Sequence, residues 1–206
     1  MENKQIKNII EAVLLAAGEP VTIKRLQSIL AETELTHNDI AKALENLAKD
    51  FNDRGIELKE VASGFRLQTK QNLQPWITKL WEEKPKKYTR ALLETIALIA
   101  YRQPVTRGEI EDVRGVAVSS YIIRTLMDRD WIRVLGYRDV PGKPAMFGTT
   151  KEFLDYFDMK SLEDLPTLAE IKDIKTIMPE LDLEPKPKED AFQQQFNSKN
   201  TTSEEE

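Results

Sequence analysis

The residue types that usually carry catalysis are sparse in this sequence. It has no cysteine, which excludes disulfides and thiolate metal sites, and its one histidine is His37. We expect His37 in the first turn of a helix, as a solvated polar residue rather than a catalytic base. A metal site would need clustered carboxylates, but acids such as Glu109, Glu111 and Asp112 are spaced as on solvated helix faces. Neither of the common glycine-rich phosphate-binding motifs occurs, so the sequence predicts no enzyme, no metal site and no cofactor.

The charge of the chain is unevenly distributed. The net charge is −5, and residues 179–206 hold eight acids and three bases, which leaves 27 acids and 27 bases in residues 1–178. A neutral body lacks the basic excess of a dedicated nucleic-acid binder. The acidic, proline-containing tail, residues 169–206, is expected to be disordered. No apolar run approaches membrane-spanning length and the start has no signal core, so we expect a cytoplasmic protein.

The sequence Pro-Val-Thr occurs twice, at 20–22 and at 104–106, each time between two apolar helical stretches. Proline cannot continue a helix and threonine can cap the next one, so each copy separates two helices. Both copies are followed by a further helix and then by two strands that form a hairpin. This order predicts an α+β, mainly α, fold of two tandem winged helix-turn-helix domains, at 1–81 and 90–168, joined by a linker at 82–89.

Several helix starts are marked by a hydroxyl residue followed three positions later by an acid, the pattern of a capping box. The pairs are Thr36 with Asp39, Thr106 with Glu109, and Thr149 with Glu152. The last pair is expected to begin a helix over residues 151–159.

The winged-helix fold leaves two classes of function open, because such domains bind DNA through the third helix or dock onto proteins. Acids alternate with bases on both expected third helices, as with Arg124 and Asp128, and each acid opposes contact with phosphate. A DNA-binding winged-helix transcriptional regulator therefore remains the alternative, with weak or indirect DNA contact expected. Trp76 and Leu80 share a helix face near the linker, where an interface and a core fit equally well. Trp131, at a helix-to-strand junction, is expected in the core.

Long stretches of the sequence resemble the segregation and condensation protein B (ScpB) family, over roughly residues 6–168. The stretches are IEAVLLAAGEPVT, GFRLQT, ETIALIAYRQPVTRGEIEDVRGV, SSYIIRTL and GYRDVPGKPAMFGTTKEFLDYFDMKSLEDLP. Two small departures are Lys143, where the family more often has arginine, and Met146-Phe147, where it more often has Leu-Tyr. Lysine keeps the charge but loses the bidentate fork of arginine.

The resemblance implies a non-enzymatic accessory subunit of the bacterial chromosome condensation and segregation complex. Such a subunit forms a homodimer through its N-terminal winged helix and binds the kleisin subunit, segregation and condensation protein A (ScpA). The kleisin bridges the heads of the structural-maintenance-of-chromosomes (SMC) ATPase, which supplies the ATP chemistry. The implied location is the cytoplasm, associated with the nucleoid.

Two sets of contact residues follow as expectations. The dimer interface is expected at Ile9, Val13, Trp76 and Leu80, although a core role fits the Ile9 and Val13 stripe as well. The kleisin-binding surface is expected at Tyr101, Arg102, Tyr121 and Arg124. The two copies differ just before Pro-Val-Thr, which is consistent with one copy specialised for self-pairing and the other for a partner.

Overall fold

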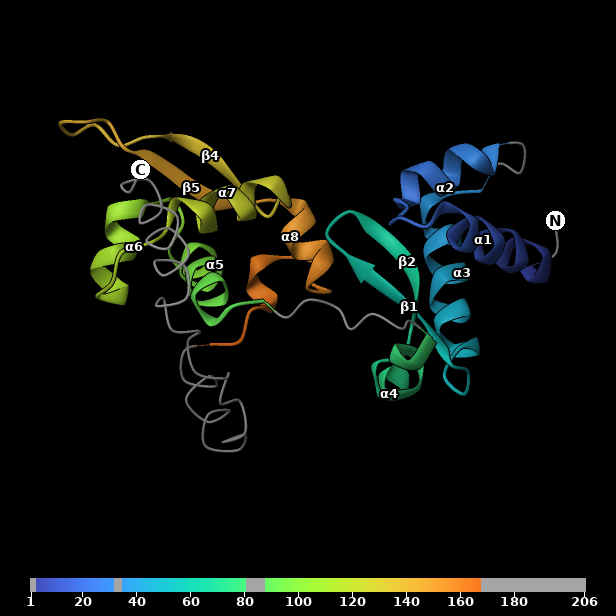
Figure 1. Ribbon diagram of the computed structural model, residues 1–206. Coiled ribbons are helices and arrows are strands. Elements are labelled where there is room, and N and C mark those ends of the chain that lie inside the picture. The colour runs from blue at the N-terminus through green and yellow to red at the C-terminus, as the bar shows by residue number, and fades with distance from the viewer. Residues whose placement is uncertain (1–2, 32–34, 81–87, 168–206) are drawn as a thin grey trace, which may run out of the picture. The chain divides into compact units, whose positions relative to one another are not determined.

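The computed structural model describes residues 3–31, 35–80 and 88–167, which form two winged-helix units (Figure 1). Each winged-helix unit has a hydrophobic core of its own. The two units together belong to one compact part of the chain, which ends at Pro166. The predicted fold class is therefore confirmed. Most of the linker expected at 82–89 and all of the tail expected at 169–206 lie outside the described residues, so the domain boundaries stay predictions.

The first unit packs three helices against one another and adds a two-stranded wing. Its elements are α1 (Asn3–Ala17), α2 (Ile23–Ile29), α3 (His37–Asp50), β1 (Ile56–Val61) and β2 (Gly64–Thr69). Helix α1 buries Ile6, Ile10 and Leu14, which recur every four residues along one face. Helix α3 begins at the expected capping box, in which the Thr36 side chain and the Asp39 side chain each accept from the backbone of the other. Helical spacing and capping together therefore define this core.

The segment after the first wing is broken into short turns rather than forming one helix. It consists of η2 (Gln71–Leu73), α4 (Gln74–Ile77) and η3 (Thr78–Leu80). Ile77 is half-buried, whereas Trp76 is 66% exposed and Leu80 is 76% exposed. The two large apolar side chains thus lie on the surface of the first unit.

The second unit repeats the order and adds a short strand and a final helix. Its elements are α5 (Arg90–Arg102), β3 (Val105–Thr106), α6 (Arg107–Arg114), α7 (Ser120–Asp128), β4 (Ile132–Tyr137), β5 (Ala145–Thr149), α8 (Lys151–Tyr156) and η4 (Leu162–Asp164). The three strands pair in the order β3-β5-β4. Trp131 is buried in this core, as expected, with Tyr88 edge-on to it at 5.3 Å between ring centroids. The guanidinium of Arg129 lies over both rings.

Both Pro-Val-Thr stretches pair with a wing, a role that the sequence did not predict. Val21 exchanges two backbone hydrogen bonds with Phe65, of 2.8 and 2.9 Å. In the second unit Val105, in β3, is paired with Phe147 of β5. The adjacent threonines, Thr22 and Thr106, cap α2 and α6 as expected. Each stretch therefore follows one helix, pairs with the wing through its valine and starts the next helix. The pairing is a single bridge at Val21 and part of the short strand β3 at Val105.

The helix expected at 151–159 begins at Lys151 as predicted, but it has a different capping residue and ends earlier. Its cap is Thr150, whose hydroxyl accepts from the backbone N–H of Phe153, and not Thr149. The Thr149 backbone N–H instead donates to the Gln103 side chain at 2.7 Å. The helix ends at Tyr156 because Asp158 adopts a left-handed conformation, with φ of 59°.

We expect Gly64→Ala to destabilise the protein far more than Gly18→Ala. Both glycines have positive φ, but an added Cβ at Gly64 would lie 2.4 Å from the carbonyl oxygen of Val21, whereas Gly18 faces open space. Left-handed strain alone should cost about 1 kcal/mol at Gly18, and the clash should raise the loss at Gly64 to at least about 3 kcal/mol. Urea unfolding of both variants measures the difference, and equal losses would contradict the role assigned to the Val21–Phe65 pairing.

Candidate docking surfaces

Helix α7, the third helix of the second unit, presents a broad exposed face. Ile122 and Leu126 point into the core, and Ser119 caps the helix by accepting from the N–H of Tyr121. Tyr121 is 75% exposed, and one turn later Arg124 is also exposed, 3.9 Å from the carboxylate of Asp128. An aromatic ring and a guanidinium on one accessible helix face are the side chains that most often anchor protein partners.

A hollow of about 340 Å³ lies beside this face. It is lined by Arg107, Ser120, Ile123, Arg124, Met127, Asp128 and Phe147. Phe147 is buried, whereas Arg124 and Asp128 are exposed, so the floor is apolar and the edge is charged. This arrangement suits an apolar side chain of a protein partner, flanked by polar contacts.

Acidic side chains of α6 fix the start of α7 and the outer end of β4 in the second wing. The Glu111 carboxylate accepts from the backbone N–H of Val118 at 2.8 Å and from Arg107 at 3.0 Å. Arg107 also donates to the Ser120 hydroxyl at 2.9 Å. These bonds, the Val118 N–H first and then Arg107, lower the pKa of Glu111 below its ordinary value of 4.5. The ionised form of Glu111 therefore holds the N-terminal end of the candidate docking helix.

Glu109 makes similar contacts, one of which involves the second wing. It accepts from the backbone N–H of Thr106 at 2.8 Å and from Arg138 at 2.5 Å, and these contacts lower its pKa. Because Arg138 follows β4 directly, this contact ties the capping box of α6 to the second wing.

The four residues expected to bind the kleisin fall into two places. Tyr121 and Arg124 lie together on α7, as described. Tyr101 and Arg102 lie at the end of α5, where the Tyr101 hydroxyl donates to the carbonyl of Pro166 at 2.5 Å. Among the described residues that line the hollow, only Arg124 belongs to the expected set. Kleisin binding by these four residues stays a prediction. Of the four, Tyr121 and Arg124 lie together on one helix, α7.

The residues expected at the dimer interface also divide. Ile9 and Val13 are half-buried and pack against the core of the first unit, so both are engaged within their own unit. Trp76 and Leu80 are exposed and remain available. The assignment of all four to an interface stays a prediction.

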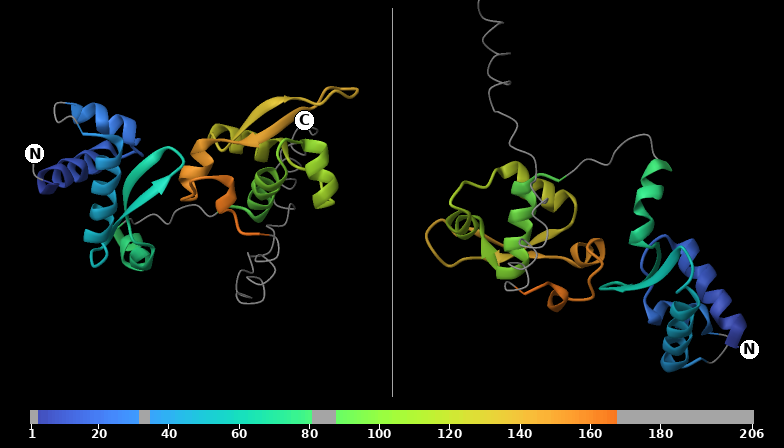
Figure 2. Two further views of the ribbon diagram at one scale, coloured as in Figure 1. Left: turned by 180° about the vertical axis from the view of Figure 1, so that it is seen from behind. Right: turned by 90° about the horizontal axis from the view of Figure 1, so that it is seen from below.

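Sequence reasoning missed several exposed apolar side chains. Leu15 lies on the outer side of α1, and the second wing exposes Val134 and Leu135. In Figures 1 and 2 the β4–β5 hairpin extends away from the helices of its unit. Strand alternation was the only available signal for these positions, and it predicts one buried face that β4 does not have.

Neither a metal-binding cluster nor a membrane-spanning helix occurs within residues 3–31, 35–80 and 88–167. Over these ranges, no group of three or more histidine, aspartate or glutamate side chains is arranged to hold a metal ion. No described helix combines the length and apolar character needed to cross a membrane.

Comparison with known proteins connects the chain to one family. The family model for segregation and condensation complex subunit ScpB matches residues 8–168. Segregation and condensation protein B homolog of Coxiella burnetii is 56% identical over 172 residues, covering 83% of this chain and 82% of the relative.

Two solved structures are also similar in sequence. ScpB from Mycobacterium tuberculosis is 36% identical, with 76% of this chain and 97% of that chain covered and a TM-score of 0.36. A dimer of the ScpB N-terminal domain complexed with ScpA peptide is 32% identical, with 38% of this chain and 96% of that chain covered and a TM-score of 0.35.

We expect the stability of the protein to fall on acidification, and Glu111→Gln to reduce this dependence. The folded-state pKa of Glu111 lies below its unfolded value, so its carboxylate stabilises the fold above that value. This contribution is lost as the pH falls through the folded pKa. Glutamine keeps an acceptor for Val118 but does not titrate. Urea unfolding at about pH 6 and about pH 3 should therefore show a smaller decrease for the variant.

The matched control is Asp112→Asn on the same helix. Asp112 is exposed, and its side chain makes no hydrogen bond or ion pair within the described part of the chain. The control should keep the pH dependence of the parent, and an equal change in both variants would contradict the role of Glu111.

Proposed function

Because this chain belongs to the family of segregation and condensation complex subunit ScpB, we propose that it is a non-enzymatic, dimeric accessory subunit that binds the kleisin ScpA. The kleisin in turn connects the subunit to the heads of an SMC ATPase. The observation that carries the proposal is the match of one family model to residues 8–168, a range that includes most of both hydrophobic cores. In this role the protein acts by docking, and the ATP chemistry belongs to its partner.

The exposed face of α7 is the proposed kleisin-binding surface. Tyr121 and Arg124 supply an aromatic and a cationic anchor, and the neighbouring hollow supplies an apolar floor at Phe147. The bonds of Glu111 hold the helix in place before a partner arrives, so little conformational entropy is lost on binding. Tyr101 and Arg102 form a second, separate contact at the end of α5.

The proposed dimer surface lies on the first unit. Trp76 and Leu80 expose large apolar side chains there, and Ile9 and Val13 lie half-buried on α1. The ScpB N-terminal domain that is 32% identical to this chain is described as a dimer complexed with ScpA peptide, and we extend both properties to this chain as proposals.

The alternative function, a DNA-binding regulator, has less support. The exposed cation of α7, Arg124, faces the carboxylate of Asp128, which opposes contact with phosphate. We therefore propose that DNA contact through this subunit is weak or indirect.

Replacing Trp76 and Leu80 together by alanine should convert the dimer into a monomer. Both side chains are exposed, so their truncation should leave the fold intact and remove only contacts between copies. Light scattering should show the mass fall to that of one 23.7 kDa chain. Tyr137→Ala in the second wing is a matched control, since Tyr137 is 67% exposed and Trp76 is 66% exposed. A dimer that survives the double substitution would show that the interface lies elsewhere.

Tyr121→Ala combined with Arg124→Glu should weaken binding of the ScpA middle segment. Loss of two anchors should raise the Kd at least about tenfold, as measured by isothermal titration. The control pair is Tyr137→Ala with Lys143→Glu, which changes an exposed aromatic residue and a lysine of the second wing. If the α7 variant keeps the parent affinity and circular dichroism spectrum, the site assignment is wrong while the family role stands.

A further inference from the structure

The two wings of the protein differ in their exposure. Every residue from 56 to 68, in β1 and β2, is half-buried or buried, and Val61 near the tip is 4% exposed. In the second wing, by contrast, β4 exposes Val134, Leu135 and Tyr137. Ile56, Leu58, Phe65 and Leu67 of the first wing pack on the core of its own unit. The tip and the other side of this wing contact the end of α8, from the second unit.

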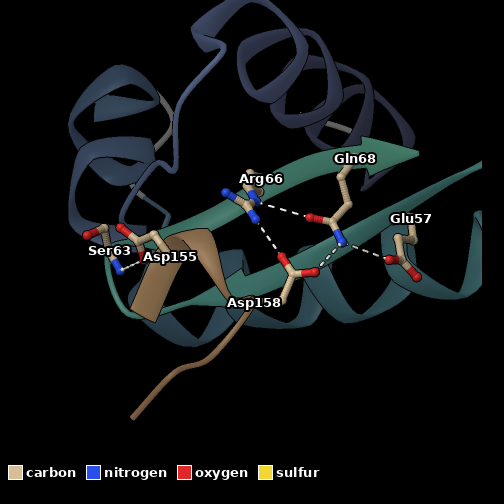
Figure 3. Close-up of polar contacts among 6 residues, drawn as sticks. All are labelled: Glu57, Ser63, Arg66, Gln68, Asp155 and Asp158. Atoms are coloured by element: carbon tan, nitrogen blue, oxygen red, sulfur yellow. Dashed lines mark hydrogen bonds and ion pairs between the residues drawn. The ribbon is translucent and has the colours of Figure 1, made fainter. Parts of the chain in front are cut away.

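Two consecutive backbone N–H groups at the tip of the first wing donate to the second unit. The N–H of Ala62 donates to the carbonyl of Met159 at 3.0 Å. The N–H of Ser63 donates to the Asp155 carboxylate at 2.9 Å, and Asp155 is only 5% exposed (Figure 3). Buried backbone donors are costly to leave unpaired, so these two bonds specify where the tip must lie.

A side-chain network extends the contact along β2. Arg66 and Gln68 both donate to the Asp158 carboxylate, at 2.5 and 3.2 Å (Figure 3). Gln68 also donates to Glu57 at 2.9 Å and accepts from Arg66 at 3.1 Å, which orients both donors. A separate ion pair joins Lys160 to Glu60. The first wing therefore presents a matched set of donors to the acceptors around the end of α8.

The second unit shapes those acceptors by its own backbone. The N–H of Met159 donates to the carbonyl of Leu154 at 2.8 Å, and Asp158 has a φ of 59°, as in a helix that ends in the left-handed conformation. The Met159 side chain is buried in the core of the second unit. Met159 thus anchors the turn, while its carbonyl and the Asp158 carboxylate face the wing.

From these contacts we infer that the β1–β2 wing is an internal docking element, which holds the two winged-helix units in one orientation. Asp155 and Asp158 are its principal acceptors. The contact fixes the distance between the exposed surfaces of the first unit and those of the second. It does so whichever partners bind to these surfaces. Within the described part of the chain, strand β4 of the second wing has no such cover, and the described contact of this wing with α6, through Arg138 and Glu109, stays inside its own unit.

The absence of cysteine from the sequence allows a direct test by spin labelling. Asn46→Cys on α3 and Asp112→Cys on α6 place one label on an exposed position of each unit, away from the contact. Pulsed electron–electron double resonance on the full chain should give a single narrow distribution of distances between the two labels. The labelled protein is diluted into unlabelled protein, so that only distances within one chain are measured.

The contact is broken by Arg66→Ala together with Asp155→Ala and Asp158→Gly. Glycine removes the Asp158 carboxylate yet tolerates the left-handed conformation, so the end of α8 is preserved. The distribution should widen at least about twofold, because domains without a fixing contact move relative to each other. The fold of the variant is checked by circular dichroism, and Asp158→Gly alone, which also keeps the fold, should give an intermediate width.

The matched control is Asp130→Gly, since Asp130 is also an aspartate of the second unit with positive φ, of 54°, but lies outside the contact. It should keep the narrow distribution of the parent. A parent distribution that is already broad, or a triple variant as narrow as the parent, would overturn the inference.

Discussion

Each winged-helix unit depends on one short antiparallel pairing, between the valine that follows its first helix and a phenylalanine of its wing. A two-stranded hairpin alone is marginally stable in water. The valine adds a further backbone pairing, a single bridge at Val21 and the strand β3 at Val105, and an anchor in the core. Val21 and Val105 are both buried, and each is followed by the threonine that caps the next helix. The pairing thus positions the wing, the core and the second helix together, and the candidate docking helix α7 packs on the core of the second unit.

Most of the fold could be predicted because its determinants are local. Apolar spacing predicted the helices, and the hydroxyl–acid pairs at Thr36 and Thr106 predicted two of their starts. The pairing of Val105 was missed because a two-residue strand has no periodicity to detect. The cap was misplaced by one position because Thr149, and not Thr150, has an acid three residues later, while the side chain of a distant residue, Gln103, bonds to Thr149.

The candidate surfaces were less predictable, because contacts between residues far apart in the sequence contribute to them. Helical periodicity indicated that Tyr121 and Arg124 share the outer face of α7, which is a local property. The hydrogen bond of Tyr101 to Pro166 joins residues 65 positions apart, and the bond of Ser63 to Asp155 joins residues 92 positions apart. Such contacts depend on how units fold together and leave no signature in the spacing of residues.

The wing contact has a consequence for how the protein unfolds. Phe65 is bonded to Val21 of the first unit, and Ser63, two residues earlier, is bonded to Asp155 of the second. Local openings of a protein occur in cooperative segments, and this hairpin belongs to two of them at once. The amide proton of Ser63 can therefore exchange with solvent only when the hairpin loosens from the second unit, and that of Phe65 only when it loosens from Val21. Two units with separate cores are in this way coupled in their stability through a stretch of three residues.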